Sequence, residues 1–208
     1  MSGLYSAKGW FTSKLSYFVK LAVRKNLSPN LFTFIGVLGG ALTAYSLLEN
    51  LWPLVAVGLV VRLAGANLDG AVARAQSKAN PLGFIINEVG DRLADFIIIS
   101  MLVVLGYRSL SPLATYVAVA ATITASLPTL VSVSAAASGG SRLNGGPLGK
   151  TERCACILIL SLLLSFGANQ VWSLCAVGVV IILGSAATAL LRARTYHTIL
   201  TSPDKEGK

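Results

Sequence analysis

The chain has 208 residues, of which 54% are hydrophobic and only 12% are charged, and its mean hydropathy is +0.72. Soluble domains carry about 25% charged residues, so this composition excludes an ordinary soluble enzyme and indicates an integral membrane protein. In a membrane protein, a formal net charge of +9 is first of all a signal of orientation, because basic residues gather on the cytoplasmic side of the bilayer. The three cysteines are too few for a disulfide framework.

Residues 1–28 predict an amphipathic juxtamembrane segment. Apolar side chains recur at helical spacing at Phe11, Leu15, Phe18 and Ala22, with lysine and arginine residues among them. Such a helix suits the surface of a membrane that contains anionic lipids, and a simple juxtamembrane anchor is its plainest interpretation. We expect no cleavable signal peptide, because the segment has no uninterrupted apolar core.

Six apolar segments follow, each near the length that crosses about 30 Å of hydrocarbon. They are expected at about 30–49, 52–75, 82–106, 112–137, 150–168 and 171–192. The predicted fold is an all-α integral membrane protein with six transmembrane helices preceded by the amphipathic helix. Residues 29–195 would form one six-helix membrane domain, and residues 196–208 a basic cytoplasmic tail.

The basic residues predict the orientation of these spans. With the amino terminus in the cytoplasm, nearly all lysine and arginine residues outside the spans fall on the cytoplasmic side, and Arg108 falls on the other. This distribution satisfies the positive-inside rule with an even number of spans. We therefore expect a multi-pass protein whose two termini are both cytoplasmic.

Charged and amide side chains interrupt the second and third spans near their predicted cytoplasmic ends. The second span ends in "NLDGAVAR", residues 67–74, and the third places four polar residues on one helical face: Asn87, Glu88, Asp91 and Asp95. Each charge at membrane depth costs about 2.5–3.5 kcal/mol on insertion scales, so such residues are usually paired or functional. An oxygen-rich face of this kind suits a hard divalent cation such as Mg²⁺ or Mn²⁺.

The spacing of these residues closely resembles the signature of the CDP-alcohol phosphotransferases, also called CDP-alcohol phosphatidyltransferases. That signature is D-x-x-D-G-x-x-A-R, about eight residues, and then G-x-x-x-D-x-x-x-D. Here "DGAVAR" at 69–74 is followed by Gly83, Asn87 and Asp91. "SPNLFT" at 28–33 resembles the segment that opens the first span in the family, and "DRLAD" at 91–95 resembles a frequent continuation of the motif.

The resemblance implies a membrane enzyme of phospholipid biosynthesis. Members usually form homodimers and transfer a substituted phosphate, commonly from CDP-diacylglycerol, to an alcohol with release of CMP. Four motif aspartates hold two divalent metal ions, either Mg²⁺ or Mn²⁺, and the last aspartate is the general base. The implied setting is a bacterial inner (plasma) membrane with a cytoplasmic active site, residues 29–195 as the catalytic domain, and no nucleic-acid partner.

The resemblance also assigns roles to individual residues. Asp91 would be the catalytic base. In an active enzyme with an altered metal site, the metal ligands would be Asp69, Glu88, Asp91 and Asn87, of which Glu88 lies beside a motif position and not on it. The donor nucleotide would be bound by Asn67, Asp69, Gly70, Ala73, Arg74, Asn80 and Gly83. Supporting positions would be Asp95, Pro29, Asn30 and Thr33.

Two motif aspartates are replaced in this chain, the first by Ala66 and the third by Asn87. Alanine cannot bind a metal ion, and asparagine offers only a neutral oxygen. One hypothesis is an active enzyme in which Asn67 and Glu88 help to form an altered metal site. The second is a catalytically impaired member that binds a CDP-lipid or a partner without turnover. The third hypothesis is a small transporter or scaffold, which does not explain the D-G-x-x-A-R spacing.

The glycine-rich stretch before the fifth span carries candidate acceptor-binding residues. Lys150 and Arg153 begin that span, and Arg142 precedes them in the loop. Lysine and arginine suit a phosphorylated or anionic acceptor, although a positive-inside anchor explains them equally well. Inositol phosphate, glycerol phosphate, serine and other alcohols all stay open as acceptors.

Overall fold

The structure is a computed structural model that describes the backbone of residues 7–140, 143 and 145–201. Side chains are described from residue 15 onward within these ranges, Leu200 excepted. The described chain contains helices and no strands. The helices are α1 (Ala7–Arg24), α2 (Pro29–Leu48), α3 (Trp52–Ala75), α4 (Pro81–Arg108), α5 (Pro112–Ala137), α6 (Lys150–Ser165) and α7 (Gln170–Thr201). The expectation of an all-α protein is confirmed.

Prolines and side-chain caps explain where several helices begin. Pro29, Pro81 and Pro112 each stand in the first turn of a helix, where a missing N–H leaves no hydrogen bond unmade. The Oδ1 of Asn80 accepts a hydrogen bond of 2.7 Å from the backbone N–H of Gly83 and so caps α4. Helix α7 extends past the predicted end near residue 192 to Thr201.

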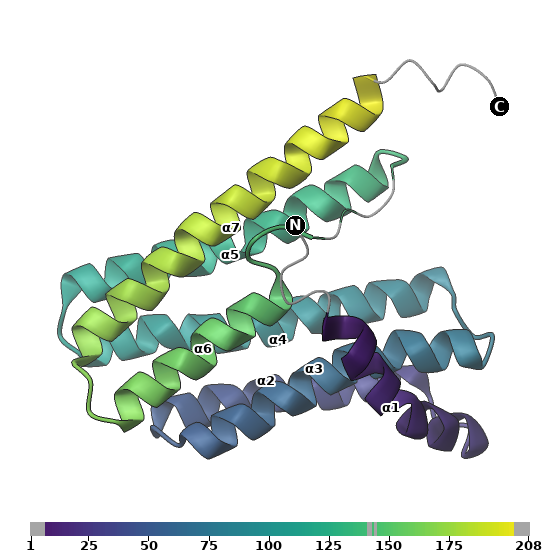
Figure 1. The fold of residues 1–208 in the computed structure, drawn as a ribbon, viewed down its shortest axis with the longest axis horizontal. Helices are drawn as coiled ribbons and strands as arrows, with labels where there is room; N and C mark the ends of the chain where they lie inside the picture. Colours follow the sequence, from purple (N-terminus) through teal and green to yellow (C-terminus); the bar gives the residue numbers. More distant parts are fainter. Residues whose placement is uncertain (1–6, 141–142, 144, 202–208) are drawn as a thin grey trace.

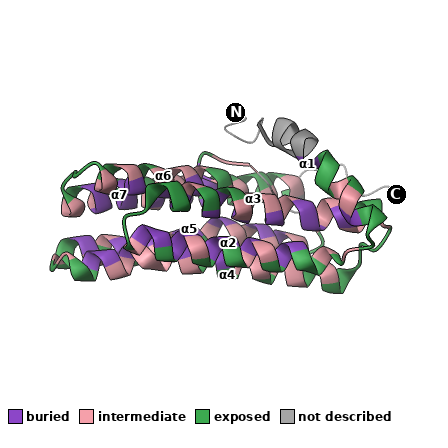
Figure 2. Ribbon diagram, turned by 90° about the horizontal axis from the view of Figure 1, so that it is seen from below, coloured by how far each residue is buried: buried purple, intermediate pink, exposed green. Residues whose placement is uncertain are grey.

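The helices after α1 form two layers. Figure 2 shows α3, α6 and α7 in one layer and α2, α4 and α5 in the other, with buried residues facing inward. Helix α2 packs on α3 and α4, and α5 packs on α7 and α4. Helix α4 therefore lies at the centre of the bundle (Figure 1). The apolar core around it includes Leu47, Val55, Ile98, Leu102 and Leu160.

Glycines allow α2 and α3 to cross at close range. A Cβ placed on Gly65 would lie 2.6 Å from the backbone nitrogen of Gly36 and 2.6 Å from the carbonyl oxygen of Phe32. Small residues at such a crossing let two backbones approach, as is common between membrane helices. The crossing fixes the start of α2 beside the last turns of α3, where the acidic motif begins.

Four helices among the described residues are long and apolar enough to cross a membrane: α2, α3, α5 and α7 over Gln170–Ile199. Helix α4 is not in this set and carries charged side chains in its first half, and α6 has only 16 residues. Large apolar side chains such as Phe34, Phe96 and Leu183 face outward, as lipid contact requires. The protein is thus a helical membrane protein with at least these four membrane-length helices.

The described part of α1 packs against the bundle. Leu15 and Ala22 are buried in a small apolar cluster with Leu68 and Val72 of α3. The side-chain amide of Gln76 donates to the carbonyl oxygens of Ala22 and Leu27, at 3.4 and 3.0 Å. Of the predicted apolar face, Leu15 and Ala22 are buried as expected, Phe18 is 51% exposed, and the side chain of Phe11 lies outside the described residues.

Candidate functional site

The predicted acidic face of α4 points at cationic side chains from α3 and α6. Asp91 is 9% exposed, and the side chain of Asp95 is 13% exposed. Both carboxylates form ion pairs with residues far away in the sequence. The charged cluster is defined here as Arg62, Asp69, Glu88, Asp91, Arg92, Asp95, Lys150 and Arg153.

Arg62 of α3 lies at the centre of the charged cluster and is fully buried. Its Nη1 lies 3.3 Å from Oδ1 of Asp91, and its Nη2 lies 2.6 Å from Oδ1 of Asp95. Nη2 also donates to the backbone carbonyl of Asp91 at 3.1 Å. A buried guanidinium is tolerated only with such partners, because an unpaired charge in the interior is strongly destabilising.

The first turn of α6 contributes two further cations. Lys150 Nζ lies 2.8 Å from Oδ2 of Asp91, and Arg153 Nη2 lies 2.8 Å from Oδ2 of Asp95. The turn is held by Glu152, whose Oε2 accepts a 3.0 Å hydrogen bond from the backbone N–H of Gly149. The side chain of Lys150 is 25% exposed and that of Arg153 is 5% exposed. Lys150 is therefore the more accessible of the two.

Arg92 completes the charged cluster from α4 itself. Its Nε lies 3.3 Å from Glu88 Oε1, and its Nη1 lies 3.4 Å from Asp95 Oδ2. Nη1 also donates to the hydroxyl of Thr129 on α5 at 2.5 Å. Glu88 is thus already engaged by a neighbouring cation one turn away.

Asp69 near the end of α3 is 4% exposed. The hydroxyl of Thr33 donates to its Oδ2 at 3.0 Å, and the backbone N–H of Gly70 donates to its Oδ1 at 2.5 Å. Asp69 is also close enough to Asp91 and Lys150 to interact with them electrostatically. Thr33 and Asp69 therefore form a hydrogen-bonded pair between α2 and α3, and Asp91 and Lys150 form an ion pair between α4 and α6 within electrostatic range of Asp69.

The residues predicted to bind the donor nucleotide lie around the ends of α3 and α4. Gly70, Ala73 and Arg74 occupy the last turns of α3, and Arg74 is exposed. The amide nitrogen of Asn67 donates to the carbonyl of Leu63 at 2.6 Å. The capping bond between Asn80 and Gly83 gives these two residues a structural role at the start of α4.

The remaining predicted residues are placed as follows. Pro29 and Asn30 begin α2, with Asn30 exposed. Asn87 lies half-buried on α4. Arg142 lies outside the described residues. Arg62 received no role from the sequence, although a single arginine within an apolar span was a signal that it must be paired.

The donor atoms of this site fit one divalent cation better than two. No group of three histidine, cysteine, aspartate or glutamate side chains converges on a metal position within the described part of the chain. Asp69 and Asp91 are the two motif carboxylates, Ala66 has no donor, and Asn87 offers an amide oxygen. Mg²⁺ is commonly held by one or two carboxylates together with substrate phosphates, so two carboxylates suffice for one such ion, although both oxygens of Asp91 already pair with Arg62 and Lys150. The motif residues do not supply protein carboxylates for a second.

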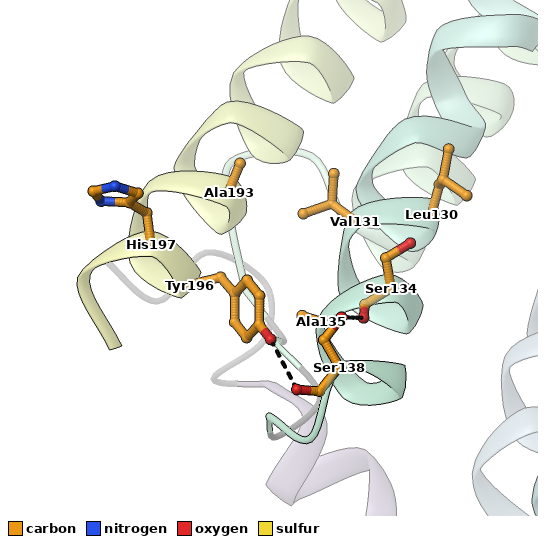
Figure 3. Close-up of a pocket in the computed structure, with 8 residues that line it drawn as sticks. All are labelled: Leu130, Val131, Ser134, Ala135, Ser138, Ala193, Tyr196 and His197. Atoms are coloured by element: carbon orange, nitrogen blue, oxygen red, sulfur yellow. Dashed lines mark hydrogen bonds between the residues drawn. The ribbon is translucent and has the colours of Figure 1, made fainter. Parts of the chain in front are cut away.

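Two hollows lie along the bundle. One has a volume of about 420 Å³ and runs from Arg92 and Asp95 along apolar residues of α4 and α5, including Phe96 and Ile99. The other, about 450 Å³, lies between the later turns of α5 and α7 (Figure 3). Tyr196 and His197 line the second hollow, and the hydroxyl of Tyr196 donates to the carbonyl of Ser138 at 3.4 Å. Only the first hollow adjoins the charged cluster.

Fold and site together define a helical membrane protein with a polar site buried among its helices. The family model for CDP-alcohol phosphatidyltransferase matches residues 26–190. The chain therefore belongs to the CDP-alcohol phosphatidyltransferase family, as its motif predicted.

Relatives support the same assignment. The chain is 32% identical over 191 residues to the phosphatidylinositol phosphate synthase of Mycolicibacterium smegmatis. The aligned region covers 88% of this chain and 82% of the relative. It also resembles solved structures of Mycobacterium tuberculosis phosphatidylinositol phosphate synthase. The complex with manganese and citrate has a TM-score of 0.68 at 21% identity, covering 92% of this chain and 91% of that chain. The form with CDP-DAG bound has a TM-score of 0.66 at 20% identity, covering 92% and 96%. At these identities the structures show a shared fold.

Proposed function

We propose that the chain is an active transferase that moves the phosphatidyl group of CDP-diacylglycerol to an alcohol and releases CMP. The observation that carries this proposal is the ion pair of Asp91 and Lys150 between α4 and α6, within electrostatic range of the buried Asp69 of α3. The solved relative with CDP-DAG bound supports the same donor class. The buried, hydrogen-bonded state of Asp69 indicates a maintained site, which argues against the catalytically impaired alternative.

The reaction is a displacement at phosphorus. The acceptor oxygen attacks the phosphorus that carries diacylglycerol, and a new P–O bond forms. The P–O bond to the bridging oxygen breaks, and CMP leaves with that electron pair. The proton of the acceptor hydroxyl passes to the carboxylate of Asp91, which acts as general base. Positioning and charge stabilisation supply most of the rate enhancement in such transfers.

A single Mg²⁺ or Mn²⁺ ion fits the remaining donor atoms. Asp69 and Asp91 would hold it, with the amide oxygen of Asn87 as an additional ligand. Glu88 would support the ion from the next position, although Arg92 already engages its carboxylate. When bound, the ion neutralises charge on the phosphate oxygens. Thr33 orients Asp69 toward that position through its hydrogen bond.

The donor would lie across the ends of α3 and α4. Arg74 is exposed at the last turn of α3, where its guanidinium can contact phosphate. Asn67, Gly70 and Ala73 would contact the nucleotide beside it. Asn80 and Gly83 would shape the opposite wall through the capped start of α4. The apolar hollow between α4 and α5 is suited to an acyl chain of the donor.

The acceptor would enter at the start of α6. Lys150 is partly exposed there and Arg153 is buried beside it. We propose a phosphorylated alcohol, with Arg142 in the preceding loop as a further contact. Inositol phosphate is the first candidate, because the M. smegmatis relative is a phosphatidylinositol phosphate synthase.

We further propose that α4 and α6 also cross the membrane, giving six spans within a catalytic domain over residues 29–195. Apart from Arg108 at the far end of α4, their charged residues lie toward one end, where Asp91 and Asp95 pair with Lys150 and Arg153, which leaves the remainder apolar. The positive-inside rule places that end, and both termini, in the cytoplasm of a bacterial inner membrane. Residues 1–28 would lie at the membrane surface, residues 196–208, which begin within the last turns of α7, would form a cytoplasmic tail, and two copies would form a homodimer.

The test is CMP release by the purified protein. CDP-diacylglycerol, Mg²⁺ or Mn²⁺ and a panel of alcohols that includes inositol phosphate are supplied in detergent micelles. We expect release that requires both metal and acceptor, and that is lost in Asp91→Asn. Arg108→Ala, at the other end of α4, is the matched control and should retain activity. Binding of the donor with no CMP release for any alcohol would establish the impaired alternative.

A further inference from the structure

The site lacks two negative charges at positions where the family motif has aspartates. Ala66 lies one helical turn before Asp69, and Asn87 lies one turn before Asp91. Each replacement removes one unit of negative charge, and Ala66 also removes a ligand atom, whereas Asn87 keeps a neutral amide oxygen. A site with two fewer carboxylates attracts two dications far less strongly, whereas phosphate chemistry still requires positive charge.

The protein itself supplies positive charge at this place. Lys150 Nζ lies 2.8 Å from Oδ2 of Asp91, on the carboxylate that the motif assigns to the reaction. Arg62 contacts the other oxygen of Asp91 but is 1% exposed and also pairs with Asp95. Lys150 is the member of the charged cluster that combines direct contact with Asp91 and an exposed side chain, at 25%.

The chemistry of lysine suits this position. An ammonium group is a compact positive charge with three N–H donors on a flexible stem. It can donate to Asp91 and at the same time to a phosphate oxygen of a bound donor. A guanidinium fixed between two buried carboxylates, as Arg62 is, lacks that freedom.

We propose that this site binds one divalent cation, at Asp69 and Asp91, and that Lys150 takes the place of a second. The inference rests on the proposed function and specifies how the altered motif performs it. Lys150 supplies positive charge to the transferring phosphate, which compensates for the second metal ion that Ala66 and Asn87, without carboxylates, do not hold. Restoring the two aspartates and removing Lys150 should then create room for a second metal ion.

The first test counts metal ions and needs no turnover. Mn²⁺ binding is titrated by electron paramagnetic resonance with CDP-diacylglycerol present, using the full chain in detergent micelles. We expect one Mn²⁺ per chain for the wild type and for the control Lys20→Ala, whose lysine is exposed on α1. The variant Ala66→Asp/Asn87→Asp/Lys150→Ala should bind two, with the spectrum of a coupled pair. Two Mn²⁺ ions, or none, in the wild type would overturn the proposal whether or not the triple variant folds.

The second test separates this role from simple contact with the acceptor. Lys150→Met should lower kcat by about 10²-fold, the usual effect of removing one charge-stabilising donor. Lys150→Arg should recover part of that loss, and the acceptor KM should change by a smaller factor than kcat. A raised acceptor KM with an unchanged kcat would assign Lys150 to the acceptor alone and refute the proposal. A wild type that binds one Mn²⁺ but releases no CMP would instead overturn the proposed function and leave the metal count standing.

Discussion

Arg62 Nη2 lies 2.6 Å from Oδ1 of Asp95, with side-chain exposures of 1% and 13%. This contact joins the middle of α3 to the middle of α4 inside a bundle whose other contacts are mainly apolar. Since the same guanidinium also reaches Asp91, one side chain orients both acidic residues. The geometry of the candidate site therefore depends on a residue that would not itself touch a substrate.

Replacing Arg62 should destabilise the protein more than replacing any exposed charged residue. In Arg62→Leu, Asp91 and Asp95 lose their common partner while staying buried, which costs about 3–5 kcal/mol of unfolding free energy. Arg108 is an exposed arginine at the end of α4, so Arg108→Ala should cost little unfolding free energy. Chemical unfolding in detergent micelles measures both. Equal stability of the two variants would show that the buried pairs contribute nothing to folding.

Thr33 should affect metal binding through its hydrogen bond to Asp69. Thr33→Val removes the hydroxyl that donates to Oδ2 of Asp69 and keeps the shape of the side chain. Partners that orient metal ligands typically change metal affinity by about 10–100-fold, so we expect weaker Mn²⁺ binding in this range. Thr33→Ser keeps the hydroxyl and should bind Mn²⁺ nearly as well as the wild type. Isothermal titration with Mn²⁺ distinguishes them, and a serine variant as weak as valine would refute the role.

Alanine should affect stability at Gly65 and donor binding at Gly70. A Cβ on Gly65 would lie 2.6 Å from backbone atoms of α2, so Gly65→Ala must push the two helices apart. We expect a loss of about 1–3 kcal/mol, the usual cost of overpacking. A Cβ on Gly70 would meet only the movable end of Arg74, at 3.2 Å. Gly70→Ala should therefore unfold normally and raise the KM for the CDP-linked donor. Thermal unfolding and donor kinetics on both variants check this contrast.

Asn80 was predicted to bind nucleotide, and its capping bond adds a structural role. Asn80→Ala should lose about 1 kcal/mol of stability through the uncapped start of α4. Asn80→Asp keeps a capping oxygen and should recover the stability. If the donor KM also recovers in Asn80→Asp, the residue acts by holding the helix start. Recovery of stability without recovery of KM would instead show direct contact with the donor.

The sequence predicted the helices well and their mutual contacts poorly. The segment expected at 52–75 coincides with α3, because Pro53 marks its start and the polar residues from Gln76 onward mark its end. The helical spacing of Asn87, Glu88, Asp91 and Asp95 likewise followed from periodicity alone. The pairings of Arg62 and Arg153 with Asp95 did not, because they depend on how three helices pack. Periodicity identifies the face of a helix, whereas only packing identifies the residue opposite.

The ion pairs of α4 also have a consequence for how the chain enters the membrane during synthesis. Arg62 precedes Asp91 and Asp95 along the chain, so part of their charge is matched as soon as α4 emerges. Lys150 and Arg153 belong to α6 and emerge only after α5 is complete. Until α6 is made, the three carboxylates of α4 (Glu88, Asp91 and Asp95) are paired with two cations, Arg62 and Arg92, so the helix carries one excess negative charge. In the proposed six-span arrangement, stable insertion of α4 should wait for α6, so a chain truncated before Lys150 should be a target for membrane proteolysis.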